Sequence, residues 1–434
     1  MTISLSTFGV HRTSDAGGLM MEDVLLSDVA KRFGTPCFVY SKLALVTAYR
    51  SLDAALKASR QGRPYLICYA VKANSNLSVL RIFAGLGSGF DIVSGGELMR
   101  VLEAGGNPGK IVFSGLGKTA AEMRLALQAN IKCFNLESEP ELDRLNNVAR
   151  ELGVVAEISL RVNPDVDAKT HPYISTGLKN NKFGIAFDRA ISVYLRAAAM
   201  PNIRVAGVDC HIGSQLTDDR PLREAMARIV VLADALAEKG VPVRHICPGG
   251  GIGITYKDES TIDLFAYVQA LESRLGSRDV ELLLEPGRVL VGNAGVLLSG
   301  VEFVKLTESK NFLVVDAAMN DLIRPSLYQA HHEVVMAGPL DATAPTRIYD
   351  VVGPVCESAD VLAHARTLAA HEGDTVAILS AGAYGFVMSS NYNSRPRAAE
   401  VMVDGSTVSV IRARETFDDL VRQERLQNSN SNID

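Results

Sequence analysis

The stretch YLICYAVKANSNLSVLRIFAGLGSGFDIV, residues 65–93, decides the fold. Two apolar runs of strand length, 65–71 and 89–93, flank a segment in which Leu77, Leu80 and Phe83 recur at helical spacing. A strand, a helix and a second strand in this order predict parallel strands joined by a right-handed crossover. The stretch therefore predicts one β/α unit.

Six more apolar runs of strand length follow, at residues 110–113, 131–135, 155–162, 204–211, 244–247 and 281–284. Segments with helical periodicity, such as 225–237, lie between them. Eight such units in about 225 residues predict an α/β fold of the TIM-like (β/α)8 barrel type. An open doubly wound sheet is the alternative, because a strand count alone does not show ring closure.

The pattern changes after Gly287. Runs at 296–304, 312–315, 347–352, 375–379, 399–403 and 407–412 are typical of strands separated by turns, and they predict a C-terminal all-β domain. Short runs at 24–26 and 38–40 are candidates for the same domain. We therefore expect the barrel to extend over 41–288. Segments 1–40 and 289–434 are expected to form a β-sandwich or β-barrel that contributes to the active site, with a frayed polar tail from Arg425.

Composition excludes several classes of protein. The 434 residues are 47% apolar and carry a formal net charge of −5, without a basic stripe, which argues against a nucleic-acid partner. No apolar run reaches the roughly 18 residues of a membrane span, and the N-terminus lacks the pattern of a secretory signal. The six cysteines contain no CxxC pair, which argues against a disulfide framework and a structural zinc site. These features favour a cytoplasmic enzyme.

Polar residues mark the ends of the predicted strands, where barrel enzymes carry their active sites. They are Lys72, Asp91, Ser114, Asn135, Arg161, His211, the glycines at 249–251 and Glu285. Partial desolvation of Lys72 would lower the pKa of its amine toward neutrality, as a Schiff-base nucleophile needs. A solvated loop lysine is the alternative.

Two glycine-containing loops follow the last two predicted strands, PGGGIG at 248–253 and EPGR at 285–288. Loops at these positions of a barrel commonly bind phosphate, and neither has the GxxxxGK[ST] pattern of a nucleoside triphosphate site. Together with Lys72 and Glu285 they fit a phosphorylated aldehyde cofactor.

Ten segments extend this pattern along the chain: YAVKAN (69–74), FDIVSGGEL (90–98), HPYISTG (171–177), KFGI (182–185), GVDCHIGSQ (207–215), GGGIGITY (249–256), EPGR (285–288), MNDLIRPSLY (319–328), GPVCESAD (353–360) and AYGFVMSSNYNSRPR (383–397). In order and spacing the chain resembles the diaminopimelate decarboxylase family from about residue 20 to 412. That family belongs to the fold-type III pyridoxal-phosphate enzymes, together with ornithine decarboxylases and alanine racemases.

The resemblance implies pyridoxal 5'-phosphate as the cofactor, bound covalently to Lys72. Glu285 would face the pyridine nitrogen and keep it protonated, His211 would lie against the ring, and Asp91 would lie near the lysine. The phosphate and its surroundings are assigned to Ser214, Gly250, Gly251, Gly287, Arg288 and Tyr384. Lys72, His211, Glu285 and Cys356 are the implied catalytic residues.

The implied substrate has a zwitterionic distal end. The resemblance assigns its carboxylate to Arg288, Arg324 and Tyr328, with Tyr384 nearby, and its ammonium to Glu357. A surface salt bridge between Arg324 and Glu357 is the structural alternative. Cys356 would protonate the substrate carbon from a neighbouring subunit, which implies a homodimer with shared active sites.

The expected reaction is the decarboxylation of meso-2,6-diaminopimelate to L-lysine and CO2, the last step of lysine biosynthesis. A decarboxylase of the same fold acting on ornithine, lysine or carboxynorspermidine is one alternative. Others are a catalytically inactive homologue that binds a partner, and a metal-dependent barrel enzyme. The last finds little support, because no HxH or HExxH motif lies at a strand end and His331 and His332 are adjacent.

Overall fold

The computed structural model describes residues 4–166, 182–341 and 343–425. Within them the chain divides into two compact units. Of the described residues, the first unit comprises 4–10, 41–166, 182–295 and 380–387, and the second comprises 11–40, 296–341, 343–379 and 388–425. The segment HPYISTG (171–177) and the predicted frayed end of the tail lie outside the described residues. The division into separately folding domains at residues 40 and 288 stays a prediction.

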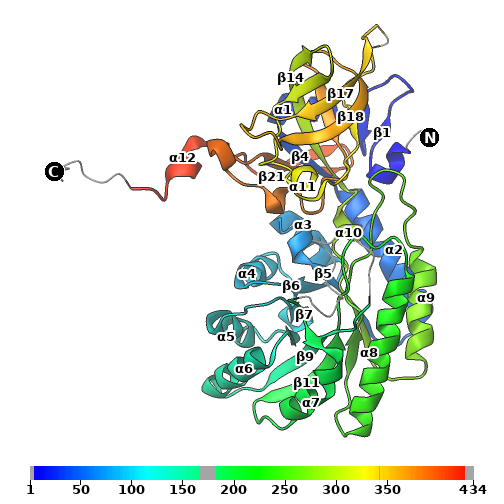
Figure 1. The fold of residues 1–434 in the computed structure, drawn as a ribbon, viewed down its shortest axis with the longest axis vertical. Coiled ribbons are helices and arrows are strands. Elements are labelled where there is room, and N and C mark those ends of the chain that lie inside the picture. Colours follow the sequence, from blue (N-terminus) through cyan, green and yellow to red (C-terminus); the bar gives the residue numbers. More distant parts are fainter. Residues whose placement is uncertain (1–3, 167–181, 342, 426–434) are drawn as a thin grey trace, which may run out of the picture. The chain divides into compact units, whose positions relative to one another are not determined.

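The first unit contains a closed parallel barrel. Its eight strands are β5 (Tyr65–Ala70), β6 (Gly89–Ile92), β7 (Ile111–Phe113), β8 (Cys133–Leu136), β9 (Ala156–Asn163), β11 (Ile203–Asp209), β12 (His245–Cys247) and β13 (Glu281–Leu284). Figure 1 labels the strands β5, β6, β7, β9 and β11. Strand β8 pairs with β9, and β13 pairs with β5, so the ring closes. The barrel prediction is confirmed, and the open sheet is excluded by this closure.

Helices alternate with these strands, as the crossover rule requires. They are α2 (Lys42–Arg60), α3 (Leu77–Gly85), α4 (Gly95–Glu103), α5 (Ala120–Gln128), α6 (Glu139–Leu152), α7 (Phe187–Ala198), α8 (Arg220–Glu238), α9 (Leu264–Leu275) and α10 (Arg288–Val291). The two-residue strand β10 (Ile185–Ala186) pairs with the end of β9. No helix among the described residues is both long and apolar enough to cross a membrane.

Local sequence signals explain where several helices begin. The side chains of Ser94 and Ser138 accept backbone hydrogen bonds at the starts of α4 and α6. Thr119 and Glu122 form a capping box at the start of α5, where each side chain bonds the other residue's backbone N–H. These caps begin each helix shortly after a strand, and the strand ends are thereby held in one layer.

The second unit is built mainly from β-sheet. Its large sheet has the order β18-β17-β15-β14-β4-β20-β21, and β19 joins β14 to β16. The strands are β4 (Cys37–Ser41), β14 (Gly295–Leu306), β15 (Asn311–Val315), β16 (Val334–Met336), β17 (Thr346–Val352), β18 (Val361–Ala369), β19 (Thr375–Ile378), β20 (Ala399–Asp404) and β21 (Thr407–Arg412). The predicted N-terminal run at 38–40 is part of β4 and does enter this sheet.

Smaller elements complete the second unit. Strands β1 (His11–Arg12), β2 (Leu19–Met21) and β3 (Val24–Leu25) form a separate small sheet. The short helices are α1 (Leu26–Phe33), α11 (Arg324–Tyr328) and α12 (Phe417–Val421). Strands β16 and β18 were not predicted, because β18 carries His364 and Arg366 within an otherwise apolar run.

Candidate active site

Lys72 lies in the turn directly after β5, and its Nζ donates a 2.6 Å hydrogen bond to Oδ2 of Asp91 on β6. The Asp91 side chain is fully buried, whereas the Lys72 side chain keeps 39% of its exposure. The predicted lowering of the Lys72 pKa is wrong for this structure. Burial lowers the pKa of the Lys72 amine. Nearby negative charges, of which Asp91 is the strongest, raise it by more, so that the pKa lies above its usual value. The amine must therefore give up a proton before it can attack, and Asp91 holds the ammonium form in place through its hydrogen bond.

Glu285 follows β13 and turns its carboxyl group into the barrel. Its Oε1 accepts a 3.1 Å hydrogen bond from Nδ2 of Asn135, which also donates to Oγ of Ser114 at 3.0 Å. Burial, followed by the nearby charges of Asp209 and Asp91, raises the pKa of Glu285 well above its usual value. This carboxyl group therefore carries a proton over a wide pH range.

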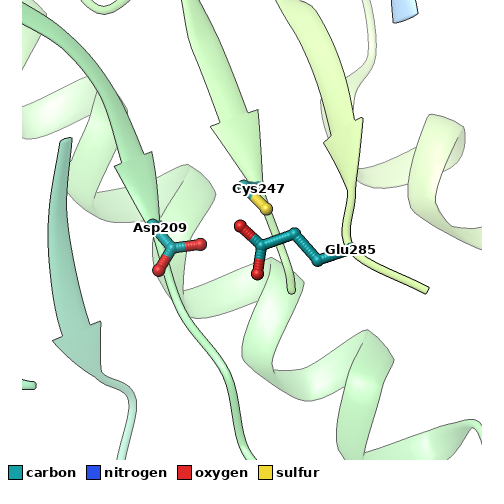
Figure 2. A group of neighbouring side chains, drawn as sticks. All are labelled: Asp209, Cys247 and Glu285. Atoms are coloured by element: carbon teal, nitrogen blue, oxygen red, sulfur yellow. The ribbon is translucent and has the colours of Figure 1, made fainter. Parts of the chain in front are cut away.

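Two further buried groups, Asp209 and Cys247, lie beside Glu285, as Figure 2 shows. The carboxyl oxygens of Asp209 and Glu285 and the sulfur of Cys247 all lie within 4.8 Å of one another. Burial raises the pKa of Asp209 to about 7 and that of the Cys247 thiol well above its usual range. Metal ligation requires a thiolate and carboxylates, so the protonated state of this group favours hydrogen bonding over metal binding.

His211 follows β11, and its Nδ1 accepts a long hydrogen bond of 3.4 Å from the backbone N–H of Gly250. Burial, the charge of Arg161 and the charge of Lys72 together lower the pKa of His211 well below its usual value. The imidazole is consequently neutral, and the proton lies on Nε2. A neutral ring of this kind can lie against an aromatic cofactor without adding a second cation beside Lys72.

The glycines of the last two loops are required by close packing. A Cβ atom on Gly250 would collide with the carbonyl oxygen of Glu285, and one on Gly251 would collide with that of Gly213. Gly251 also has a φ of +102°, which side chains rarely adopt. A Cβ on Gly287 would press on Ala70 and Ala73, on either side of the lysine turn. The two loops therefore lie directly against each other, because Gly250 packs on the backbone of Glu285.

Arg288 supplies a buried cation at this end of the barrel. Its Nη2 donates a 3.0 Å hydrogen bond to Oγ of Ser214, and its Nη1 donates one of 2.5 Å to the hydroxyl of Tyr256. The guanidinium lies 4.8 Å from the ring centre of Tyr384. Tyr384 is in turn held against the lysine turn, because its backbone N–H donates to the carbonyl of Ala73 at 2.8 Å.

The groups in the barrel fit pyridoxal phosphate. An accessible amine on Lys72 matches the aldehyde, and the buried carboxyl of Glu285 matches a ring nitrogen. The cation of Arg288 and the tightly packed glycine loops match a phosphate. The structure thus brings together the barrel residues that the sequence predicted: Lys72, Asp91, His211, Ser214, Gly250, Gly251, Glu285, Gly287, Arg288 and Tyr384.

The predicted substrate residues of the second unit occupy two places within it. Arg324 begins α11, is 6% exposed, and bonds through Nη1 to Nε2 of His332 at 2.8 Å. Tyr328 ends the same helix. Cys356 and Glu357 are exposed in the loop after β17, where the backbone N–H of Cys356 donates to Oδ1 of Asn393 at 3.0 Å.

No sequence pattern assigned a role to Asp209, although it belongs to this site. Its side chain is 1% exposed, and its Oδ1 has no hydrogen-bond partner among the described residues. A signal was present, since Asp209 is a charged residue that ends the run of buried residues in strand β11 and precedes His211 by two positions. Its effect on Glu285 depends on a contact between strands that are far apart in the sequence.

Comparisons with known proteins agree with the geometry. Residues 46–292 match the family model described as pyridoxal-dependent decarboxylase, pyridoxal binding domain. The chain is 58% identical to a diaminopimelate decarboxylase of Pseudomonas aeruginosa, covering 94% of this chain and 97% of the relative. A Vibrio cholerae enzyme of the same name is 57% identical, with coverages of 93% and 96%.

Solved structures of the same name have the same fold. A diaminopimelate decarboxylase of Helicobacter pylori complexed with L-lysine is 43% identical, with a TM-score of 0.88, and the match covers 92% of this chain and 99% of that one. The enzyme of M. jannaschii in complex with L-lysine is 36% identical, with a TM-score of 0.92 and coverages of 98% and 99%. The chain belongs to the diaminopimelate decarboxylase family of pyridoxal-dependent decarboxylases.

Proposed function

We propose that the chain converts meso-2,6-diaminopimelate to L-lysine and CO2, the last step of lysine biosynthesis. The observation that carries this proposal is the set of groups at the C-terminal ends of the barrel strands. An amine on Lys72, a buried carboxyl on Glu285 and a buried guanidinium on Arg288 supply what the reactive end of an amino acid and a pyridoxal cofactor require. The names of the relatives support the choice of substrate.

Bound pyridoxal phosphate supplies an electron sink that takes up the electron pair of the carbon–carboxylate bond as CO2 leaves. Lys72 would hold the cofactor, and Asp91 would orient the lysine Nζ by accepting its hydrogen bond. Glu285 would keep a proton at the ring nitrogen, and neutral His211 would lie against the ring. Ser214 and Arg288 would bind the phosphate, together with Gly250, Gly251, Gly287 and Tyr384.

Loss of CO2 leaves the reacting carbon one proton short, and a proton delivered to that carbon completes lysine. We assign this proton to Sγ of Cys356, which is exposed within its own unit and is therefore accessible. The other five cysteines are buried and are poorly placed to exchange protons with a substrate.

The distal end of the substrate carries an ammonium and a carboxylate. Arg324, Arg288 and Tyr328 are proposed to bind the carboxylate, and Glu357 to bind the ammonium. A fixed guanidinium can form a bidentate pair with a carboxylate. Ornithine and lysine have no carboxylate at their distal end, so they cannot form this pair. This arrangement would make the enzyme select diaminopimelate over simple diamino acids.

The active site is further proposed to be shared between two copies of the chain, with Lys72 from one copy and Cys356 from the other. Two inactive variants, Lys72→Ala and Cys356→Ala, would then restore activity when they are mixed and allowed to exchange subunits. Random pairing in a two-fold dimer leaves about one quarter of the sites intact, so about one quarter of the original activity is expected. Mixtures that stay inactive despite proven exchange would contradict the shared site.

A reducing compartment is proposed for the working enzyme. None of the six cysteines forms a disulfide, and five of them are buried as small apolar side chains. The net charge of −5 gives no reason to expect a nucleic-acid partner.

CO2 release from the purified enzyme with pyridoxal phosphate tests the proposed function. We expect turnover of meso-diaminopimelate with lysine as the product, and little turnover of ornithine, lysine or carboxynorspermidine. Preference for one of these other substrates would overturn the assignment of the distal pocket and leave the cofactor site intact. Release from none of them would favour an inactive homologue.

A further inference from the structure

His332 is a fully buried histidine, and both of its ring nitrogens are engaged within the second unit. Its Nδ1 lies 2.8 Å from the carbonyl oxygen of Leu379, at the end of β19. Its Nε2 lies 2.8 Å from Nη1 of Arg324, the first residue of α11. The ring therefore connects the sheet of this unit to the arginine that is proposed to bind the distal carboxylate.

The chemistry of the two partners fixes where the imidazole carries its proton. A carbonyl oxygen can only accept, so Nδ1 must donate its hydrogen to Leu379. A guanidinium nitrogen can only donate, so Nε2 must present a lone pair to Arg324. His332 is therefore a neutral imidazole of the Nδ1–H form. A second proton, on Nε2, would make the ring a cation and would place two donors and two cations in contact within a buried site.

The surroundings of Arg324 explain why such a support is needed. Helix α11 has only five residues, from Arg324 to Tyr328, so the arginine has no long helix beneath it. A guanidinium binds a carboxylate through two parallel bonds only when its plane is held in the correct orientation. Charged groups near His332 include Arg366, which donates to the His332 carbonyl at 2.8 Å, and the chain neighbours His331 and Glu333.

We propose that His332 is a positioning residue that fixes the Arg324 guanidinium for recognition of the distal carboxylate of the substrate. This inference deepens the proposed function and rests on the role assigned there to Arg324. His332 contributes to substrate affinity and selectivity and has little effect on cofactor binding or on bond cleavage. The adjacent His331, which bonds Glu333 and Arg366, has no such role.

Two isosteric variants separate positioning from simple packing. The Asn amide of His332→Asn can replace Nδ1 as the donor to Leu379 but does not extend to Arg324. The Gln carbonyl of His332→Gln reaches the Nε2 position and can still accept from Arg324. Loss of a buried bond to a charged group predicts that His332→Asn raises KM for diaminopimelate about tenfold, with kcat changed less than about threefold. His332→Gln should keep KM close to that of the unmodified enzyme. His331→Gln is the matched control, and its KM should also stay close to that value.

The holoenzyme is used throughout, and the visible absorbance of the bound cofactor and Tm report whether each variant is intact. Arg324→Gln alone tests the proposed function, and it should raise KM strongly. Adding His332→Asn to Arg324→Gln should then raise KM no further, because the two residues act through one contact. Should Arg324→Gln raise KM while His332→Asn leaves it unchanged, the role of His332 is overturned and that of Arg324 stands. An unchanged KM in Arg324→Gln overturns both.

A measurement on the unmodified residue covers the case in which the Asn variant does not fold. Nitrogen-15 NMR of histidine-labelled holoenzyme should show one histidine that is neutral and protonated at Nδ1. The His332→Gln spectrum, which must lack this signal, assigns it. Observation of an Nε2–H form or a cation at His332 would overturn the inference without reference to activity.

Discussion

Replacing Asp209 by asparagine should flatten the pH dependence of thermal stability of the full-length, cofactor-free chain. Lys72 forms an ion pair with Asp91, and Arg161 forms one with Glu137, but among the described residues Asp209 and Glu285 form none. These two buried carboxyl groups lie within 4.8 Å of each other, together with Cys247. At an effective dielectric constant of about 20, two charges at this distance repel by about 3 kcal/mol, which corresponds to about two pKa units.

The sign follows from the direction of the pKa shifts. Burial, with smaller contributions from the charges of Asp91 and Glu137, raises the pKa of Asp209 to about 7. Burial and then the charge of Asp209 raise the pKa of Glu285 well above its usual value. The folded chain thus keeps protons that the unfolded chain has lost above its ordinary carboxyl pKa of about 4. The stabilisation from Asp209 is fully present below about pH 4 and is lost as the pH rises through its folded pKa of about 7. Asp209→Asn removes one titrating group and the charge that shifts Glu285.

Differential scanning calorimetry from pH 5 to 8 measures this effect. In a chain of this length, a difference of about 3 kcal/mol in unfolding free energy corresponds to about 3 °C in Tm. The fall in Tm between pH 5 and pH 8 should therefore be about 3 °C smaller in Asp209→Asn than in the unmodified protein. The groups that face Glu285 from the surrounding strands, Lys72, Asp91, Arg161 and the buried cysteines, are unchanged in the comparison. The control variant Asp258→Asn changes an exposed aspartate, and its Tm should depend on pH in the same way as that of the unmodified protein. Parallel curves for Asp209→Asn and the unmodified protein would refute the coupling of the two carboxyl groups.

Three further outcomes concern the cofactor, the substrate and the packing of the barrel. Lys72→Ala should abolish the visible absorbance of the bound cofactor, and persistence of that band would place the reactive amine elsewhere. Glu357→Asp should lower kcat/KM for diaminopimelate about tenfold without changing that band, since a shortened carboxylate loses a charged hydrogen bond; an unchanged kcat/KM would remove Glu357 from the substrate site. Glu141→Ala leaves the buried Lys118 ammonium without its 2.6 Å partner, which should cost about 3 to 5 kcal/mol of unfolding free energy in urea. The control Glu151→Ala removes an exposed partner and should cost less than about 1 kcal/mol.

Local patterns were sufficient to predict the elements of the barrel. The eight runs of strand length correspond to its eight strands, because parallel strands buried on both faces are short, nearly continuous apolar segments. Lys72 and Glu285 could be selected because each directly follows such a run. The glycine loops at 249–251 and 287 could be selected because only glycine tolerates such close backbone packing.

Interactions between distant segments could not be read from these patterns. The pairing of β8 with β9 closes the ring, and the 2.6 Å contact between Lys72 and Asp91 reverses the expected direction of the lysine pKa shift. The sequence by itself determined which residues end the barrel strands, since hydrophobic periodicity is a local property. Only the tertiary structure decided the charge state of Lys72, the shared environment of Asp209 and Glu285, and the proton position on His332. These depend on distances of a few ångströms between residues separated by 8 to 76 positions, where burial and Coulomb energy change steeply.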